Sequence, residues 1–60
     1  MHLVKRYSNR KLYDASERHQ ITLDGISGLV TSGEDVKVVD NDSGEDITTV
    51  ILTEILLHQN

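Results

Sequence analysis

Four amino-acid types are missing from this 60-residue chain, which contains no cysteine, proline, phenylalanine or tryptophan. Without cysteine the chain can form neither a disulfide framework nor a thiolate zinc site, a composition that is typical of cytoplasmic proteins. The chain also lacks an apolar run long enough to cross a membrane and the apolar segment of a signal peptide. We therefore expect a cytoplasmic protein.

The apolar residues are almost all aliphatic, and leucine, isoleucine and valine together contribute 18 residues. A domain of this size buries only about 60% of its unfolded surface, so its core is marginal and oligomerisation is a common source of further stability. We expect a single domain over residues 1–60. Because the sequence stays strongly apolar up to Leu57, we expect it to be the N-terminal part of a longer protein.

Charge is divided along the chain. Residues 1–20 carry a net charge of +3 and residues 21–60 a net charge of −7. Four of the six basic residues lie in the segment KRYSNRKLYD (5–14), together with both tyrosines, the only aromatic residues. This asymmetry favours binding of a polyanion by the N-terminal third of the chain. A basic segment taken alone, however, is more often a solvated surface.

Two segments that lie 26 residues apart resemble each other. KLYDASERHQIT (11–22) and KVVDNDSGEDIT (37–48) share lysine, aspartate, isoleucine and threonine at equivalent positions. Each predicts a strand, a turn and a short return strand, followed by a helix that is capped by Thr22 or Thr48. Gene duplication and a shared local pattern of hairpin-to-helix connections both explain the similarity.

The helical patterns predict a first helix over residues 23–31 and a second that starts after Thr48 and runs to the end of the chain. Gly25 and Gly28 each weaken the first helix by roughly 1 kcal/mol relative to alanine, which predicts close packing against a neighbour at both. The alternating, β-branched stretch 35–40 predicts a strand. The expected class is α+β: a basic N-terminal β-hairpin and two strand–turn–strand units, each followed by a helix.

The N-terminal hairpin is expected to turn at Ser8-Asn9-Arg10, because asparagine tolerates the left-handed conformation that such turns need. If the loop is Asn9-Arg10, the cross-strand pairs are Tyr7–Leu12, Arg6–Tyr13 and Lys5–Asp14, and a longer loop would change this register. This register puts the two tyrosines on opposite faces. We therefore expect one tyrosine to be buried in the core and the other to be exposed.

Catalytic and metal-binding chemistry has little support in the sequence. The three histidines lie far apart, no serine has a nucleophile-elbow context, and no glycine-rich loop resembles a phosphate cradle. The acidic residues of segment 40–46 miss the EF-hand spacing and predict a solvated loop. We expect no enzyme activity, no metal site and no cofactor.

A basic two-stranded ribbon fits the major groove of B-DNA, where arginine and lysine reach phosphates or guanine edges and asparagine reads adenine. The candidate DNA-binding residues are Lys5, Arg6, Tyr7, Asn9, Arg10, Lys11 and Tyr13. The alternative is a non-catalytic interaction module whose apolar face docks a partner. Convergence of Arg6, Arg10 and Lys11 on one exposed face would favour DNA, and their scattering would favour the alternative.

The second helix is apolar around nearly its whole circumference, and such a helix must be covered on all sides. One face can pack on the chain's own sheet, and a neighbouring subunit of a two-fold dimer is expected to cover the other. The candidate interface residues are Val50, Ile51, Leu52, Ile55, Leu56 and Leu57. The alternative cover is a C-terminal region of the full protein.

Four segments together resemble the N-terminal DNA-binding domain of the polyhydroxyalkanoate synthesis repressor family: KRYSNRKLYD, ITLDGISGLV, VVDNDSGEDIT and VILTEILL. The resemblance covers nearly the whole chain, and its most specific parts are Y-x-N-R-K-L-Y-D and G-E-D-I-T. It implies a bacterial transcriptional repressor that binds double-stranded promoter DNA, controls polyhydroxyalkanoate synthesis and granule-associated genes, and associates with the polymer. For the interaction-module alternative, the docking partner would include a granule surface.

The resemblance gives this chain the signature Tyr7, Asn9, Arg10, Lys11, Leu12, Tyr13 and Asp14. The chain departs from the family pattern at three places. Ala15 and Ser43 replace threonines, and His19-Gln20 stands where an aromatic residue is typical. Polymer association is not assigned to these residues, because proteins of the family carry a further C-terminal region.

Overall fold

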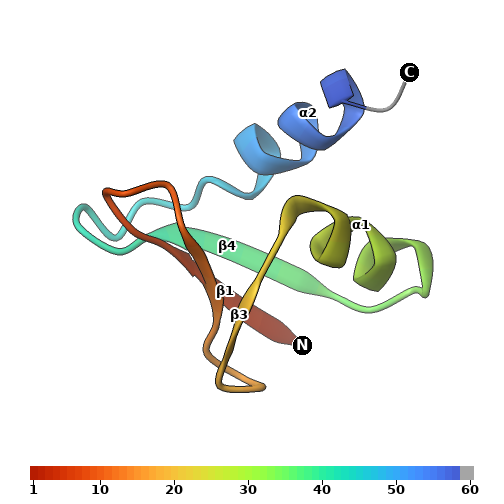
Figure 1. Ribbon diagram of the computed structural model, residues 1–60, viewed down its shortest axis with the longest axis horizontal. Helices are drawn as coiled ribbons and strands as arrows, with labels where there is room; N and C mark the ends of the chain where they lie inside the picture. Colours follow the sequence, from red (N-terminus) through yellow and green to blue (C-terminus); the bar gives the residue numbers. More distant parts are fainter. Residues whose placement is uncertain (59–60) are drawn as a thin grey trace.

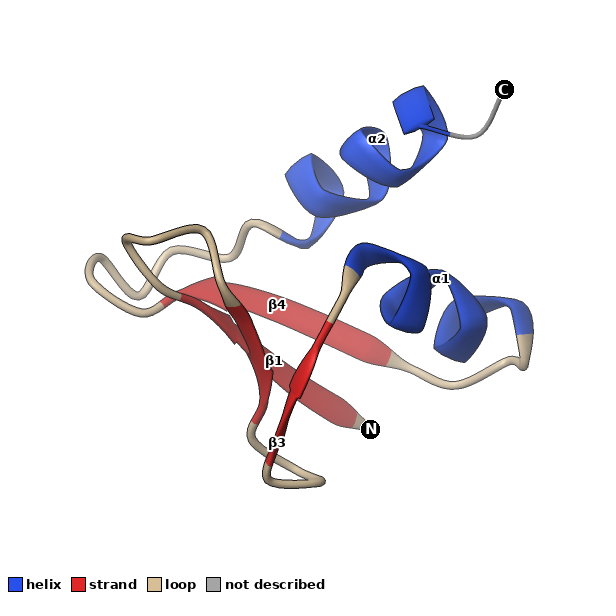
Figure 2. Ribbon diagram, viewed as in Figure 1, coloured by secondary structure: helices blue, strands red, loops and turns tan. Residues whose placement is uncertain are grey.

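The computed structural model describes residues 1–58 as four strands and two helices. The elements are β1 His2–Arg6, β2 Leu12–Asp14, β3 His19–Ile21, α1 Leu23–Thr31, β4 Val36–Asp40 and α2 Thr48–His58. The strands form one sheet in the order β3-β2-β1-β4, and both helices pack on the same face of it (Figure 1). The α+β class is confirmed (Figure 2), as is the first helix over residues 23–31.

The core lies between the helices and the sheet face that they cover, here called the inner face. Val4 and Val38 of the two neighbouring strands are fully buried there, against Ile26 of α1 and Ile51 of α2. The complete core cluster is aliphatic: Val4, Leu12, Ile26, Val38, Ile51 and Ile55. Within residues 1–58, neither helix is long and apolar enough to span a bilayer.

Strand β1 occupies the interior of the sheet. It pairs antiparallel with β2 and parallel with β4, with Val4 opposite Val38. The parallel pairing joins β1 to β4, the first and last strands of residues 1–58, and the hairpin pattern did not indicate it. It attaches the second strand–turn–helix unit to the N-terminal hairpin.

The predicted register of the β1–β2 hairpin is wrong by one residue. Lys5 lies opposite Tyr13 and Arg6 opposite Leu12, because the loop has three residues instead of two. The Arg10 N–H donates to the Tyr7 carbonyl oxygen (2.9 Å) and the Tyr7 N–H donates to the Lys11 carbonyl oxygen (2.9 Å). Arg10 is left-handed, with φ of 65°, which is the pattern of a type I turn followed by one residue in the αL conformation.

The shift of one residue changes the position of the tyrosines. Side chains alternate between the two faces of a strand, so Tyr7 and Tyr13 now share the face opposite the helices. Tyr7 is exposed and Tyr13 is half-buried. The expectation that one tyrosine belongs to the core is therefore wrong.

The predicted cap of α1 is confirmed and the predicted cap of α2 is wrong. The Thr22 hydroxyl accepts a hydrogen bond from the Gly25 N–H (3.1 Å). Thr48 is already the first residue of α2, and its hydroxyl instead accepts from the Val38 N–H (2.9 Å) and donates to the Asp46 carboxylate (2.6 Å). Thr48 thus ties the start of α2 to the sheet. The expected continuation of this helix over residues 59–60 lies outside the described residues.

The two glycines of α1 differ. A Cβ atom on Gly25 would lie 2.7 Å from Cγ1 of Ile21, so the predicted close packing is confirmed there. A Cβ atom on Gly28 would meet nothing within 4 Å, so the same prediction is wrong at Gly28.

The sequence repeat is also a repeat of hydrogen bonds. In each unit an aspartate at the end of a strand accepts from two backbone N–H groups of the following turn: Ser16 and Glu17 donate to Asp14, and Asp42 and Ser43 donate to Asp40. Each turn then contains a left-handed residue at the equivalent position, Arg18 in the first and Gly44 in the second. The second unit reduces the predicted return strand to a single bridge between Val39 and Asp46.

Candidate nucleic-acid interface

The sheet face opposite the helices, here called the outer face, has no element packed on it within residues 1–58 (Figure 2). By the strand register, its outward positions are Leu3, Lys5, Tyr13, Gln20, Lys37 and Val39. Tyr7 and Lys11, which pair at the end of the hairpin, extend this face. None of these side chains is acidic, although the chain as a whole has a net charge of −4.

The tip of the hairpin, residues 7–11, projects beyond the paired strands, and each of its residues is exposed. Asn9 stabilises the tip, since its side-chain oxygen accepts a hydrogen bond from the Lys11 N–H (3.0 Å). Such a contact across two residues is the usual way in which asparagine supports a turn. The tip therefore presents the cations Arg10 and Lys11 on a fixed backbone.

Arg6 has a different position from the other candidate cations. Its side chain lies on the inner face, where its Nη1 atom is 3.6 Å from Oε1 of Glu54 in α2. Arg6 and Arg10 line a hollow of about 470 Å³ whose other lining residues are Leu12, Leu23, Ile51 and Glu54. Arg6, Arg10 and Lys11 therefore do not converge on one exposed face, and by the criterion stated above this scattering favours the interaction module over DNA binding. Lys5, Tyr7, Lys11 and Tyr13 do share the outer face.

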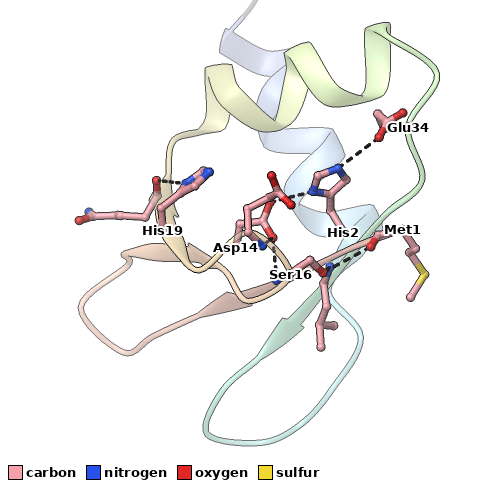
Figure 3. A network of polar contacts seen from close by, with 9 residues as sticks. Met1, His2, Asp14, Ser16, His19 and Glu34 are labelled. Carbon is pink, nitrogen blue, oxygen red and sulfur yellow. Dashed lines mark hydrogen bonds and ion pairs between the residues drawn. The ribbon is translucent and has the colours of Figure 1, made fainter.

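Asp14, the last residue of the sequence signature, is buried and holds three hydrogen-bonding partners together. Its side chain is only 1% exposed, and its Oδ2 atom is 2.8 Å from Nδ1 of His2 (Figure 3). Its other oxygen accepts from the N–H groups of Ser16 and Glu17. Burial alone would raise the pKa of Asp14, but the hydrogen bonds from His2 and the two backbone groups outweigh it and lower the pKa.

His2 and its two acidic partners form a contact that the sequence reading missed. The second ring nitrogen of His2, Nε2, lies 3.3 Å from Oε1 of Glu34, in the loop between α1 and β4. His2 and Asp14 are diagonal neighbours on the inner face, since Val4 lies opposite Asp14. The correct hairpin register would therefore have placed them together.

The contact between His2 and Asp14 makes stability depend on pH. The hydrogen bond to Asp14 raises the pKa of His2, so its stabilising effect is complete below the ordinary pKa of 6.5 and is lost as the pH rises through the folded-state value. The lowered pKa of Asp14 adds stability at pH values above its ordinary pKa of 3.8, and this stability is lost as the pH falls through the folded-state pKa.

We expect the melting temperature of the wild type to fall between pH about 5 and about 8, and the His2→Gln variant to show a smaller fall. Equal falls in the two proteins, measured by circular dichroism, would contradict this role of His2.

The acidic turn after β4 uses its carboxylates locally. Hydrogen bonds from the N–H groups of Ser43 and Asp42 lower the pKa of Asp40, and those from Thr48 lower the pKa of Asp46. Among residues 1–58, no three histidine, aspartate or glutamate side chains are grouped so as to hold a metal ion.

The structure divides the candidate oligomer interface into two sets. Ile51 and Ile55 are buried in the chain's own core and Leu52 is half-buried, so the first two are not available to a partner. Val50, Leu56 and Leu57 are 50%, 70% and 71% exposed. The surface left for a partner is therefore these three residues with Leu52.

The domain combines a sheet face whose outward strand positions carry lysines and no acidic side chain with a cationic hairpin tip, and a basic patch on one face is a feature of nucleic-acid-binding domains. The family model described as the PHB/PHA accumulation regulator DNA-binding domain matches residues 3–60, and the chain belongs to this family.

Two relatives are each 40% identical to this chain over 57 residues, which is 95% of it. One is an uncharacterised protein of Allochromatium vinosum, and the other is an uncharacterised protein in the phbA 5′ region of Thiocystis violacea. The chain spans 37% and 41% of their respective lengths. No solved structure matches the chain.

Proposed function

We propose that this domain is the DNA-binding part of a bacterial cytoplasmic transcriptional repressor that controls polyhydroxyalkanoate synthesis and granule-associated genes. The observation that carries the proposal is the exposed hairpin tip, residues 7–11, with Arg10 and Lys11 at its end. The membership of a family of PHB/PHA accumulation regulators supports the choice of target genes. The name of one relative, which places it in the phbA 5′ region, supports the same choice.

The proposed mode of binding is insertion of the tip into the major groove, which is wide enough for a two-stranded ribbon. Arg10 and Lys11 contact phosphates or guanine edges there, while Lys5, Tyr7 and Tyr13 approach the backbone from the outer face. Asn9 keeps its turn-stabilising hydrogen bond and offers its side-chain amide to a base edge. Arg6, which is on the inner face beside Glu54, serves the hairpin-to-helix contact instead.

Salt-dependent binding of duplex DNA is the direct test. We expect about three to five phosphate contacts in each chain, and therefore a slope of roughly −3 to −5 in a plot of log affinity against log salt concentration. Gel-shift or anisotropy titrations with bacterial promoter DNA at two or more salt concentrations would measure it. A domain that binds no duplex even at low salt would overturn the proposed function.

A second function, homo-oligomerisation, is favoured by the apolar surface of α2. Beside its exposed residues runs a groove of about 290 Å³ between the two helices, lined by Ser27, Val30, Thr31, Leu52, Ile55 and Leu56. We propose that a second copy of the chain covers this surface in a two-fold dimer, which would present two hairpins to two half-sites. A partner protein, the polymer granule surface or the remaining part of the full-length protein would be the occupant if the domain stays monomeric.

Charge introduced at Leu56 tests the dimer. Because Leu56 is 70% exposed in the single chain, we expect Leu56→Asp to fold normally but to be monomeric in sedimentation at micromolar concentration, where the wild type is dimeric. Thr49→Asp, at an exposed position in the first turn of the same helix, adds the same charge and should leave the dimer intact. A monomeric wild type would refute the dimer, as would a Leu56→Asp variant with wild-type mass.

A further inference from the structure

We propose that Lys37 of β4 contacts the DNA backbone, and that the duplex follows a diagonal row formed by Lys37, Lys5 and Lys11 across the outer face. The inference rests on the proposed DNA-binding function and adds a contact that lies outside the hairpin. Neither the basic segment of the sequence nor the signature residues include Lys37.

The strand register places the three lysines in line. Lys37 lies opposite Leu3 of β1, and Lys5 is two residues further along β1 on the same face. Lys11 is paired with Tyr7, which is two residues beyond Lys5. Each step thus crosses one strand and advances two residues, which corresponds to about 8 Å between Cα atoms.

The surface around Lys5 is apolar and covers the aliphatic stem of this lysine, whereas Lys11 and Lys37 are exposed. Leu3, Tyr13 and Val39 are only half-exposed although no element of residues 1–58 covers this face, which means that the side chains of the face cover one another. Lys5 lies opposite both Tyr13 and Val39 and is itself half-buried. Lysine side chains in such surroundings bury their aliphatic stems and keep the ammonium group in water.

The direction of the row agrees with the position of the acidic turn. Residues 41–45 follow the end of β4, next to Arg6, whose carbonyl oxygen accepts from the Asn41 N–H (2.8 Å). At the hairpin tip the row ends with Lys11, which lies on the β2 side of β1, whereas the acidic turn lies on the β4 side. The row therefore leads away from these acidic residues. Asp46 lies near Lys37, but its carboxylate accepts hydrogen bonds from the N–H and hydroxyl of Thr48, at the start of α2.

An extended polyanion fits this arrangement better than a small anion does. The three cations come from different strands and lie on a sheet face, so they form a line instead of a pocket. Lysine ammonium groups act as point charges toward phosphate, and they position a duplex without reading its sequence. Lys37 is therefore expected to strengthen binding equally for all DNA sequences.

The test compares the salt dependence of three proteins: the wild type, Lys37→Gln and Arg18→Gln. Arg18 is an exposed cation in the turn between β2 and β3 and lies outside the row, so its substitution removes the same charge elsewhere. We expect Lys37→Gln to make the salt slope shallower by about 0.9 and to weaken binding to specific and random duplexes alike. Arg18→Gln should leave the slope unchanged, and circular dichroism should show that both variants are folded.

The outcomes separate this inference from the proposed function. If the wild type binds DNA with a steep salt slope and Lys37→Gln has the same slope, the row is refuted and the hairpin proposal stands. Equal losses in Lys37→Gln and Arg18→Gln would also refute the row, because they would show a response to net charge alone. A wild type that binds no duplex would overturn both.

Discussion

Replacing Asp14 with alanine is expected to lower the free energy of unfolding by about 3 kcal/mol, because removal of this buried carboxylate leaves its three hydrogen-bonding partners unsatisfied. The Ser16 and Glu17 N–H groups would lose their acceptor and His2 its nearest carboxylate. A 60-residue domain has a total stability of roughly 3–9 kcal/mol, so this loss would leave little or no folded protein. Urea denaturation followed by circular dichroism would measure it.

Asp14→Asn is the matched control for this effect. The amide oxygen can still accept from the two backbone N–H groups, while the charge opposite His2 is removed. We expect Asp14→Asn to be more stable than Asp14→Ala and to lose most of the pH dependence. An alanine variant with the wild-type denaturation midpoint would show that Asp14 does not hold the hairpin together.

The double variant Arg10→Ala/Lys11→Ala is expected to weaken DNA binding about 10- to 100-fold at moderate salt, and to make the salt slope shallower by about 1.8 if each cation neutralises one phosphate. Both side chains are exposed and contribute little to packing, so the domain should remain folded. Titrations against the same promoter duplex at two salt concentrations would measure both quantities.

The charge-conserving exchange Arg10→Lys/Lys11→Arg serves as the control. It keeps two cations at the tip and should retain the salt slope, whereas contacts that depend on the shape of the guanidinium group should weaken. Wild-type affinity in the alanine double variant would refute the hairpin as the DNA-contacting element.

The parts of the fold that depend on neighbouring residues were predictable from the sequence. Thr22 caps α1 by accepting from the Gly25 N–H within the same turn, and Gly33, just beyond the helix, has a left-handed φ of 84°. The turn in the second unit follows from a run of aspartate, asparagine, serine and glycine. The basic, tyrosine-containing segment also indicated the family and its DNA-binding role.

The hairpin register was not predictable in this way because the loop depends on Arg10. A left-handed arginine has no signal comparable to that of glycine, and a three-residue loop differs from a two-residue loop by a single position. That position reverses the face of every side chain in one strand relative to the other. It placed both tyrosines on the outer face, where the prediction had one of them in the core, and it placed Arg6 on the helix side.

Contacts between distant parts of the chain could not be predicted from the sequence either. The parallel pairing of β1 with β4, the contact of His2 with Glu34 and that of Arg6 with Glu54 each join segments that are far apart in the sequence. The apolar pattern of α2 showed that the helix must be covered. It did not show which residues face the sheet, since Ile51 and Ile55 differ little in type from Leu56 and Leu57.

The parallel pairing of β1 with β4 has a consequence for how the chain folds. The hairpin closes over a three-residue loop, but Val4 meets Val38 only after the chain has passed through β2, β3 and α1. Closing that long segment costs chain entropy before the core contacts compensate for it, and such non-local pairings slow folding. The cationic tip thus belongs to the part of the domain that can form early, whereas α2 can acquire its place on the sheet only when β4 joins it.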